Sequence, residues 1–357
     1  MGRYAKTLIR QALAEGPTVL IHVKKYWKKA VFDLLVEQID RWLSEAPAKA
    51  LPWALVGPAF ARRVAVVDPR VCESTLLCRA HARLGSAYRA LGRFADAEGE
   101  YRTSEGLGVS ALEIADVLRR KAYLRLEQGL GDEARLLVEQ AIEIYRLEGD
   151  LFDRNPLGWA LVARGQVEFE RGDRGKALAD FTAALGLIDH RSDPMGYYGT
   201  IHNLSVVLVD SGTPRDLGIA LNHLNAAYRR FVGYSQRHLA KYKLRWLQGL
   251  AQKRFGAVRQ AEIYFRMARE GLVALEAPLE VAMISLDLGL ILLEDRRFEE
   301  LRRLAFETHR LAQGLGATTE ALATLALWVR ATQGDLDHHL LGSLRTNLAR
   351  STAPAGL

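Results

Sequence analysis

The chain has 357 residues, of which 49% are hydrophobic and 25% charged, and its formal net charge at pH 7 is +7. Such a chain can bury a large core, and its only cysteines, Cys72 and Cys78, lie six residues apart, a spacing that matches no metal or redox motif. No apolar segment has the length of a secretory signal or a membrane span, so the composition favours a soluble cytoplasmic protein without a membrane partner.

Residues 1–30 form a segment with a pattern of its own. Tyr4, Leu8 and Leu13 fit one side of a short helix that Gly16 ends, and a basic run follows that contains two aromatic residues. Two interpretations stay open for this run. It can begin a solvated helix with Trp27 packed against its neighbour, or it can contact phosphate or an acidic surface through Lys24, Lys25, Lys28 and Lys29.

From Val31 the apolar residues recur at the three- and four-residue steps of amphipathic helices. A first helix runs to about Leu43, and a second is expected over residues 48–66. The second helix contains Pro52 near its start and Pro58 further in, where proline removes a backbone hydrogen bond.

A repeat of about 40 residues then dominates the sequence. Its marker is a small residue, and a glycine follows seven positions after each of the first five markers; an alanine comes five residues after four of these glycines. This pattern predicts pairs of helices: the small residue lies where two helices cross closely, the glycine ends the first helix, and the alanine packs the second helix back. The markers are Gly85, Ala122, Gly165, Ser205, Gly249 and Gly289.

The clearest unit resembles the tetratricopeptide repeat (TPR) family, through Leu84-Gly85, Tyr88, Ala97 and Tyr101. The resemblance implies an all-α solenoid, a right-handed superhelix of antiparallel helix pairs, over residues 31–334. Its long repeats are similar to those that follow the DNA-binding domains of many bacterial regulators, although residues 1–30 are too few for such a domain. A capping helix over residues 336–348 and a disordered tail are expected within residues 335–357.

No catalytic, nucleotide-binding or metal-binding motif stands out, so the sequence predicts a non-enzymatic protein without cofactor or metal. In the TPR family the first helix of each pair lines a groove. The resemblance therefore implies a protein or peptide partner, and the cations in the groove would select an acidic one. The expected partner-binding residues are Arg89, Arg119, Tyr123, Gln166, Phe169, His202, Asn203, Lys243, Trp246, Lys253 and Arg254.

An acid-free stretch, residues 217–261, gives the alternative hypothesis of nucleic-acid or other polyanion binding. Its aromatic and basic residues alternate, which suits stacking and phosphate contacts, but the same residues can be core and solvated or paired charges. Together with the basic run of residues 24–29, the alternative site comprises Arg229, Arg230, Arg237, Lys241, Arg245 and Arg259.

Overall fold

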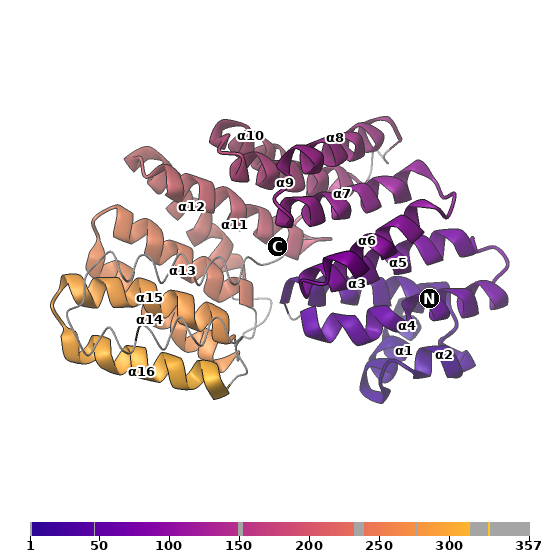
Figure 1. Ribbon diagram of the computed structural model, residues 1–357, viewed down its shortest axis with the longest axis horizontal. Coiled ribbons are helices and arrows are strands. Elements are labelled where there is room, and N and C mark those ends of the chain that lie inside the picture. Colours follow the sequence, from indigo (N-terminus) through magenta and orange to yellow (C-terminus); the bar gives the residue numbers. More distant parts are fainter. Residues whose placement is uncertain are drawn as a thin grey trace. The chain divides into compact units, whose positions relative to one another are not determined.

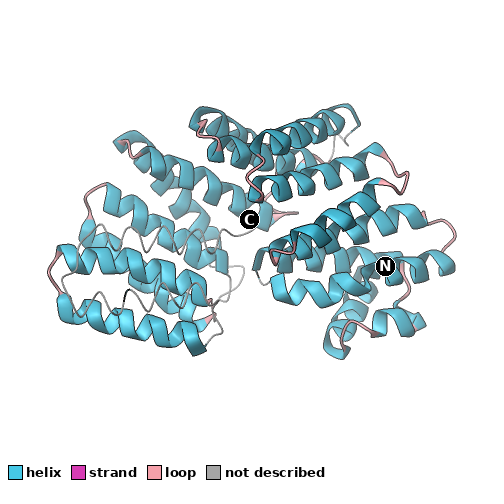
Figure 2. Ribbon diagram, in the orientation of Figure 1, coloured by secondary structure: helices cyan, strands magenta, loops and turns pink. Residues whose placement is uncertain are grey.

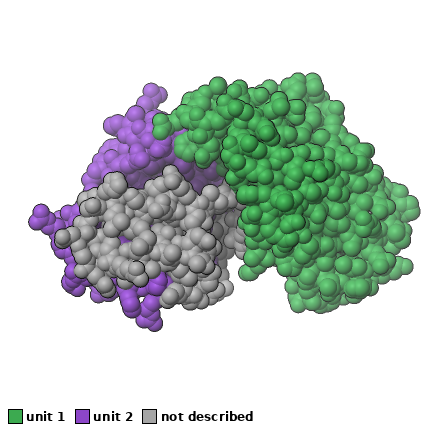
Figure 3. Space-filling model, viewed as in Figure 1, with its two compact units in different colours: residues 1–188, 354–357 green, residues 189–353 purple. Residues whose placement is uncertain are grey.

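The computed structural model describes residues 2–45, 47–148, 153–231, 239–275 and 277–314, and also Trp328. This part of the chain consists of helices and short connections without a strand (Figure 2). The chain divides into two compact units, residues 1–188 and residues 189–353 (Figure 3). The predicted capping helix and tail, residues 335–357, lie outside the described residues.

Unit 1 is built from consecutive helices that pack on one another (Figure 1). The first helices of its pairs also contact each other, α3 with α5, α5 with α7 and α7 with α9, more closely than the second helices do. These first helices therefore form the inner side of the unit. The elements are α1 (Gly2–Glu15), α2 (Val19–His22), the 3₁₀ helix η1 (Lys24–Tyr26), α3 (Lys29–Glu45), α4 (Pro47–Val67), α5 (Glu73–Ala90), α6 (Phe94–Glu105), α7 (Ala111–Glu127), α8 (Gly131–Glu148), α9 (Asn155–Glu170) and α10 (Arg174–Leu185).

Unit 2 has the same scheme of antiparallel pairs. Each helix packs on the next, and the first helices α11 and α13 also contact one another. Its described elements are α11 (Pro194–Ser211), α12 (Pro214–Phe231), α13 (Leu239–Arg254), α14 (Val258–Ala274), α15 (Pro278–Glu294) and α16 (Phe298–Gly314).

The predicted turns have the backbone conformation that the glycine pattern implies. All five turn glycines have positive φ, from 68° to 88°, in the left-handed region that L-residues with a Cβ avoid. In the sixth turn Arg296 takes the same conformation with φ 55°. The five glycines are Gly92, Gly129, Gly172, Gly212 and Gly256.

The small residues lie where the two helices of a pair cross. A Cβ added at Gly165 would come within 2.7 Å of the Phe181 ring, and one at Gly249 within 2.4 Å of the Phe265 ring. Contacts this short leave no room for a side chain, so glycine lets each aromatic ring of the second helix reach the backbone of the first. The prediction of close crossings is confirmed at these positions.

The N-terminal segment packs onto the repeats. Helix α1 contacts α3 and buries the side chains of Leu8, Ile9 and Ala12. Tyr26 is fully buried, and its hydroxyl donates a hydrogen bond of 2.9 Å to Glu15. The indole of Trp27 donates to the carbonyl of Leu20 at 3.0 Å. Residues of the N-terminal segment are therefore part of the core of unit 1.

Candidate functional site

The inner side of unit 1 contains a pocket of about 400 Å³. Helices α5 and α7 form one wall, and the end of α8 and the start of α9 form the other. Apolar and aromatic side chains make up much of the surface, whereas arginines and acids occupy the remainder. The apolar lining residues are Cys78, Ala82, Leu112, Val117, Pro156, Leu157 and Trp159.

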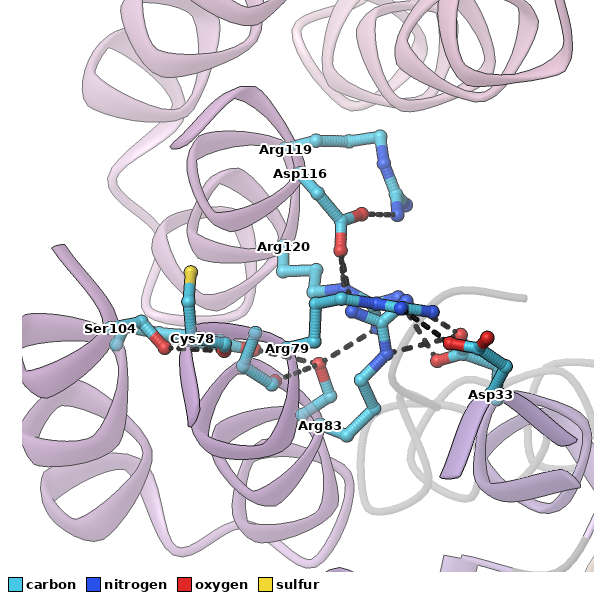
Figure 4. Close-up of polar contacts among 12 residues, drawn as sticks. Asp33, Cys78, Arg79, Arg83, Ser104, Asp116, Arg119 and Arg120 are labelled. Carbon is cyan, nitrogen blue, oxygen red and sulfur yellow. Dashed lines mark hydrogen bonds and ion pairs between the residues drawn. The ribbon is translucent and has the colours of Figure 1, made fainter. Parts of the chain in front are cut away.

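A cluster of ion pairs lies along the same side of unit 1 (Figure 4). Arg83 of α5 is bound by two carboxylates, Asp40 of α3 at 3.0 Å and Asp116 of α7 at 2.8 Å. Arg120 bridges the same two carboxylates, each at 3.0 Å. Arg119 pairs with the other oxygen of Asp116. Arg83 of α5 and Arg120 of α7 are thus held between carboxylates of α3 and α7, and Arg119 pairs with Asp116 within α7.

Burial and charge act in opposite directions on the carboxylates of this cluster. Burial alone would raise the pKa of Asp116, but the charges of Arg120, Arg83 and Arg119 outweigh it and hold the pKa well below its ordinary value. The pKa of Asp40 is also lowered, because Arg120 and Arg83 overcome its burial. Both groups are therefore carboxylates at neutral pH, and the cluster stays ionised.

Two guanidinium groups at the pocket have no acidic partner among the residues that the structure describes. Arg146 near the end of α8 and Arg154 before α9 are both exposed and both line the pocket. They contrast with Arg83, which is paired with Asp40 and Asp116, two carboxylates that it shares with Arg120. The guanidinium groups of Arg146 and Arg154 lie beside the apolar part of the cavity, whose lining also includes the carboxylates of Glu113 and Asp153.

The predicted groove residues of unit 1 lie on this inner side. Arg119 extends over the ring of Trp159, with its Cζ 5.7 Å from the ring centroid. Arg89 is buried, pairs with Glu127 and lies 5.5 Å from the centroid of Tyr123. Arg89 and Tyr123 are therefore supporting contacts between α5 and α7, since both are more than 90% buried.

Gln166 and Phe169 of α9 are partly buried. They follow the small residue Gly165 by one and four positions on the same helix, and neither lines the pocket, which ends at Trp159. Their predicted role in binding stays a prediction.

Four predicted residues lie on the first helices α11 and α13 of unit 2. His202 and Asn203 are on α11, with the His202 Nδ1 and the Asn203 Oδ1 3.4 Å apart. Burial, and next the charge of Lys243, lower the pKa of His202 to about 4, so its ring is neutral near pH 7. Lys243 itself pairs with Glu280 at 3.1 Å, and the indole of Trp246 donates to Asp287 at 2.7 Å.

Cations at the end of α13 also have partners on neighbouring repeats. Lys253 lies 3.4 Å from the carboxylate of Glu294, and Arg254 donates to the carbonyl of Asp210 at 3.2 Å. The acids that are missing from residues 217–261 are thus supplied by α11 and α15.

The residues of the polyanion alternative have varied surroundings. Arg229 and Arg259 are exposed, whereas Arg245 stacks on Tyr228 with its Cζ 3.6 Å from the ring centroid, and Lys241 lies 5.4 Å from that of Tyr242. The side chain of Arg230 and all of Arg237 lie outside the described residues.

In the N-terminal run of that alternative, two of the four lysines are paired. Lys25 is 3.8 Å from Glu15 and Lys29 is 2.6 Å from Asp33. Lys24 and Lys28 are exposed and have no acidic partner among the described residues. The ammonium of Lys28 lies 5.7 Å from the ring centroid of Tyr4.

Several residues of the site were missed by the sequence prediction, which placed the groove no further than three residues before each small residue. Arg79, Asp116 and Trp159 lie six residues before Gly85, Ala122 and Gly165, one helical turn earlier on the same face. Arg83 and Arg120 lie two residues before their markers, the position of Asn203 in its own repeat. The recurrence of polar or aromatic residues at these two positions was the available signal.

No family model matches this chain, and no curated protein matches it. The solved structures do give matches. A Rap protein complexed with Competence and Sporulation Factor is 13% identical, with a TM-score of 0.60, over 90% of this chain and 89% of that one. The Rap conjugation gene regulator of the plasmid pLS20, in complex with the Phr* peptide, is 14% identical, with a TM-score of 0.50, over 92% and 98% of the two chains.

A signal-transduction ATPase of the STAND class from Pyrococcus horikoshii, which has a tetratricopeptide repeat sensor, is 14% identical to this chain. Its TM-score is 0.60, and the match covers 94% of this chain but 53% of the ATPase chain. At sequence identities this low, the similarity to these structures shows the fold alone. With the glycine turns and close helix crossings, they show that the chain has the all-α, TPR-like solenoid fold.

Proposed function

We propose that the protein is a non-enzymatic scaffold that binds a peptide or a peptide segment of a protein partner, as a regulator or adaptor. The observation that carries this proposal is the pocket on the inner side of unit 1, which combines an apolar wall with two guanidinium groups that no acid of the described residues neutralises. A stack of helix pairs leaves its inner face open, because each pair buries its apolar surface against the next pair.

The pocket suits a segment that has an aromatic or aliphatic side chain next to a carboxylate. The apolar side chain would enter beside Leu157 and Trp159, where it loses contact with water. The carboxylate would pair with Arg146 and Arg154, which supply selectivity and steer the encounter. Since Arg83 and Arg120 are already bound by carboxylates, their role is to fix the positions of α5 and α7 under the ligand.

Peptide-bound Rap structures among the matches support this proposal through their shared fold, since one is complexed with Competence and Sporulation Factor and another with the Phr* peptide. The inner position of the pocket on first helices is consistent with such binding. Two residues of unit 2, Asn203 and Trp246, would add a second contact region on α11 and α13.

The test is a selection from a random peptide display library against the whole chain. We expect enriched peptides to contain an acidic residue beside an aromatic or aliphatic one. Synthetic versions should bind with an affinity that falls at least tenfold for Arg146→Glu combined with Arg154→Glu, since charge reversal replaces attraction by repulsion. Trp159→Ala should weaken binding without changing its dependence on salt.

The matched control is Arg102→Glu, which reverses an exposed arginine on the second helix α6. Its affinity for the selected peptides should equal that of the unaltered chain. Peptides without an acidic residue, or equal losses in the control and in the pocket variants, would contradict the pocket assignment.

Polyanion binding through residues 217–261 stays a prediction. The contacts of Lys243, Lys253 and Arg254 with acidic residues or carbonyls of neighbouring repeats leave fewer available cations there than the sequence implies. A nucleic-acid probe whose affinity falls steeply with salt, and is lost in Arg229→Glu with Arg259→Glu, would support that alternative.

A further inference from the structure

Helix α4 presents an exposed face that is both apolar and basic. Leu55 is 50% exposed and Val66 is 74% exposed, and the exposed Arg62 and Arg63 lie between them along the helix. Residues 47–67 contain no acidic residue that could balance these charges within the helix. At 100° per residue, Leu55, Arg62 and Val66 fall on one stripe, and Arg63 borders it.

The opposite side of α4 belongs to the core of unit 1. Phe60, Ala61 and Val64 are fully buried, and α4 packs on both α3 and α5. By length and composition alone the segment Ala48–Val67 could cross a membrane, so the expectation that no apolar segment is long enough for a span is wrong for this helix. Its buried side is committed to the repeat, so only the exposed stripe is available to another surface.

A second acid-free segment, residues 16–32, packs beside this helix through the contact of α2 with α4. The guanidinium of Arg63 lies 5.1 Å from the ring centroid of Trp27, and Lys28 lies 5.7 Å from that of Tyr4, which is 60% exposed. Helix α1 continues the basic character, because its buried side faces α3 while its exposed side has Arg3, Lys6 and Arg10.

The acids that flank these segments already have partners. Glu15 accepts the hydrogen bond of Tyr26, Asp33 binds Arg79 at 2.7 Å, and Asp68 binds Arg70 at 3.0 Å. They leave the charges of Arg62 and Arg63 unbalanced. The N-terminal face, as we call this surface, consists of Tyr4, Lys24, Trp27, Lys28, Leu55, Arg62, Arg63 and Val66.

We propose that the N-terminal face binds the surface of a membrane that contains anionic phospholipids. Basic side chains attract the headgroups, while aliphatic and aromatic side chains on the same face enter the boundary between headgroups and acyl chains. Nucleic acid would satisfy the cations but would leave Leu55 and Val66 in water. The mixture of both kinds of side chain on one acid-free face therefore favours lipid. Helix α4 would lie along the membrane.

The experiment is vesicle flotation with the whole chain. One set of vesicles contains phosphatidylcholine alone, and the other contains phosphatidylcholine mixed with phosphatidylglycerol. We expect flotation only with the mixed vesicles, and less of it as salt rises. Arg62→Glu with Arg63→Glu should lower the partition coefficient at least tenfold, because each basic residue near an anionic surface contributes about fivefold.

Two controls distinguish lipid binding by this face from a general effect of charge and from polyanion binding. Arg229→Glu with Arg259→Glu makes the same charge change at two exposed positions of unit 2 and should leave flotation intact. Leu55→Ser with Val66→Ser keeps every charge and should reduce flotation several-fold while binding to heparin stays unchanged.

Three results would overturn the proposal. They are absence of flotation with mixed vesicles, equal losses in the two charge-reversed variants, and full flotation of the serine variant, which would show that Leu55 and Val66 do not enter the membrane. Circular dichroism of each variant confirms folding, and none of these residues lines the peptide pocket, so the two proposals fail or succeed separately.

Discussion

Replacement of Asp116 by asparagine tests whether the cluster on the inner side of unit 1 holds the repeats together. The change keeps the shape of the side chain but removes the charge that faces Arg83, Arg119 and Arg120. The side chains of Arg83 and Arg120 are 10% and 9% exposed, so water cannot replace the lost carboxylate. Asp40 remains as a partner for both of them.

The magnitude follows from these surroundings. Removing one partner of a buried ion pair costs about 3–5 kcal/mol, because the other charge stays buried. Asp116 is itself 20% exposed and Asp40 compensates in part, which places the expected loss near the lower limit, at about 3 kcal/mol. Asp132→Asn is the matched control: its carboxylate pairs with Arg171 but is 91% exposed, and its loss should stay below about 0.5 kcal/mol.

The assay is urea unfolding followed by circular dichroism and tryptophan fluorescence, repeated over a range of pH. Because the folded pKa of Asp116 lies below its ordinary value, the stabilisation is complete above about pH 4 and is lost as the pH falls through the folded pKa. The difference between the unaltered chain and Asp116→Asn should therefore shrink in acid.

A double-mutant cycle measures the coupling within the cluster. Asp116→Leu combined with Arg83→Met, a pair that joins α7 to α5, should cost less than the sum of the two single changes, since each single change leaves an unbalanced buried charge. If Asp116→Asn loses no more than Asp132→Asn, or if the cycle is additive, the cluster does not stabilise the contact between α5 and α7.

Three further predictions concern single positions in unit 2. Gly249→Val puts a Cβ 2.4 Å from the Phe265 ring and should cost about 2–3 kcal/mol in urea unfolding, with part regained in Gly249→Val/Phe265→Leu; no regain would refute the steric cause. Gly256→Ala meets no atom within 4 Å but must keep φ at 88°, so the same assay should give about 1 kcal/mol, and an unchanged stability would contradict backbone strain. Between pH 6.5 and about 4, His202 is protonated in the unfolded chain but neutral in the folded chain, so stability should rise with pH by up to about 3 kcal/mol across this range. His202→Gln should flatten this slope, and equal slopes in the two proteins would show that another group titrates.

The fold could be predicted because its requirements are local. A left-handed turn favours glycine at Gly92 or Gly256, and a crossing as close as that at Gly165 excludes larger side chains, so both leave marks at fixed intervals in the sequence. These marks depend on the backbone of one helix pair and are independent of what the protein binds.

The site was harder to predict because the residues that pair with one another in it lie about one repeat apart in the sequence. Arg79 and Asp33 are 46 residues apart in the sequence, and Trp246 and Asp287 are 41 apart. A charge count over a short window of the sequence does not include both members of such a pair. The acid-free stretch 217–261 accordingly suggested many available cations, whereas Lys243 and Lys253 pair with α15. Opposite charges spaced by about one repeat length would have been the better signal.

The pocket needed the structure for a different reason. Its two walls come from the first helices α5 and α7 and from the junction of α8 with α9, and the sequence pattern does not fix the path of that junction. Arg154 precedes the first turn of α9, outside the helical periodicity from which groove positions were derived. Because such a residue lies outside the helices, the repeat pattern could not assign it to the inner side or to any other side.

The turn between α15 and α16 shows how far the turn residues can vary. Arg296 accepts a left-handed conformation that costs a residue with a Cβ about 1–2 kcal/mol, and the helix pair still closes, with Leu301 fully buried in place of the usual alanine. The packing of the two helices therefore imposes the turn, and glycine only relieves it. Stacks of this kind can exchange a glycine for a long charged side chain at their rim and acquire a new contact there, at a stability cost smaller than that of one core substitution.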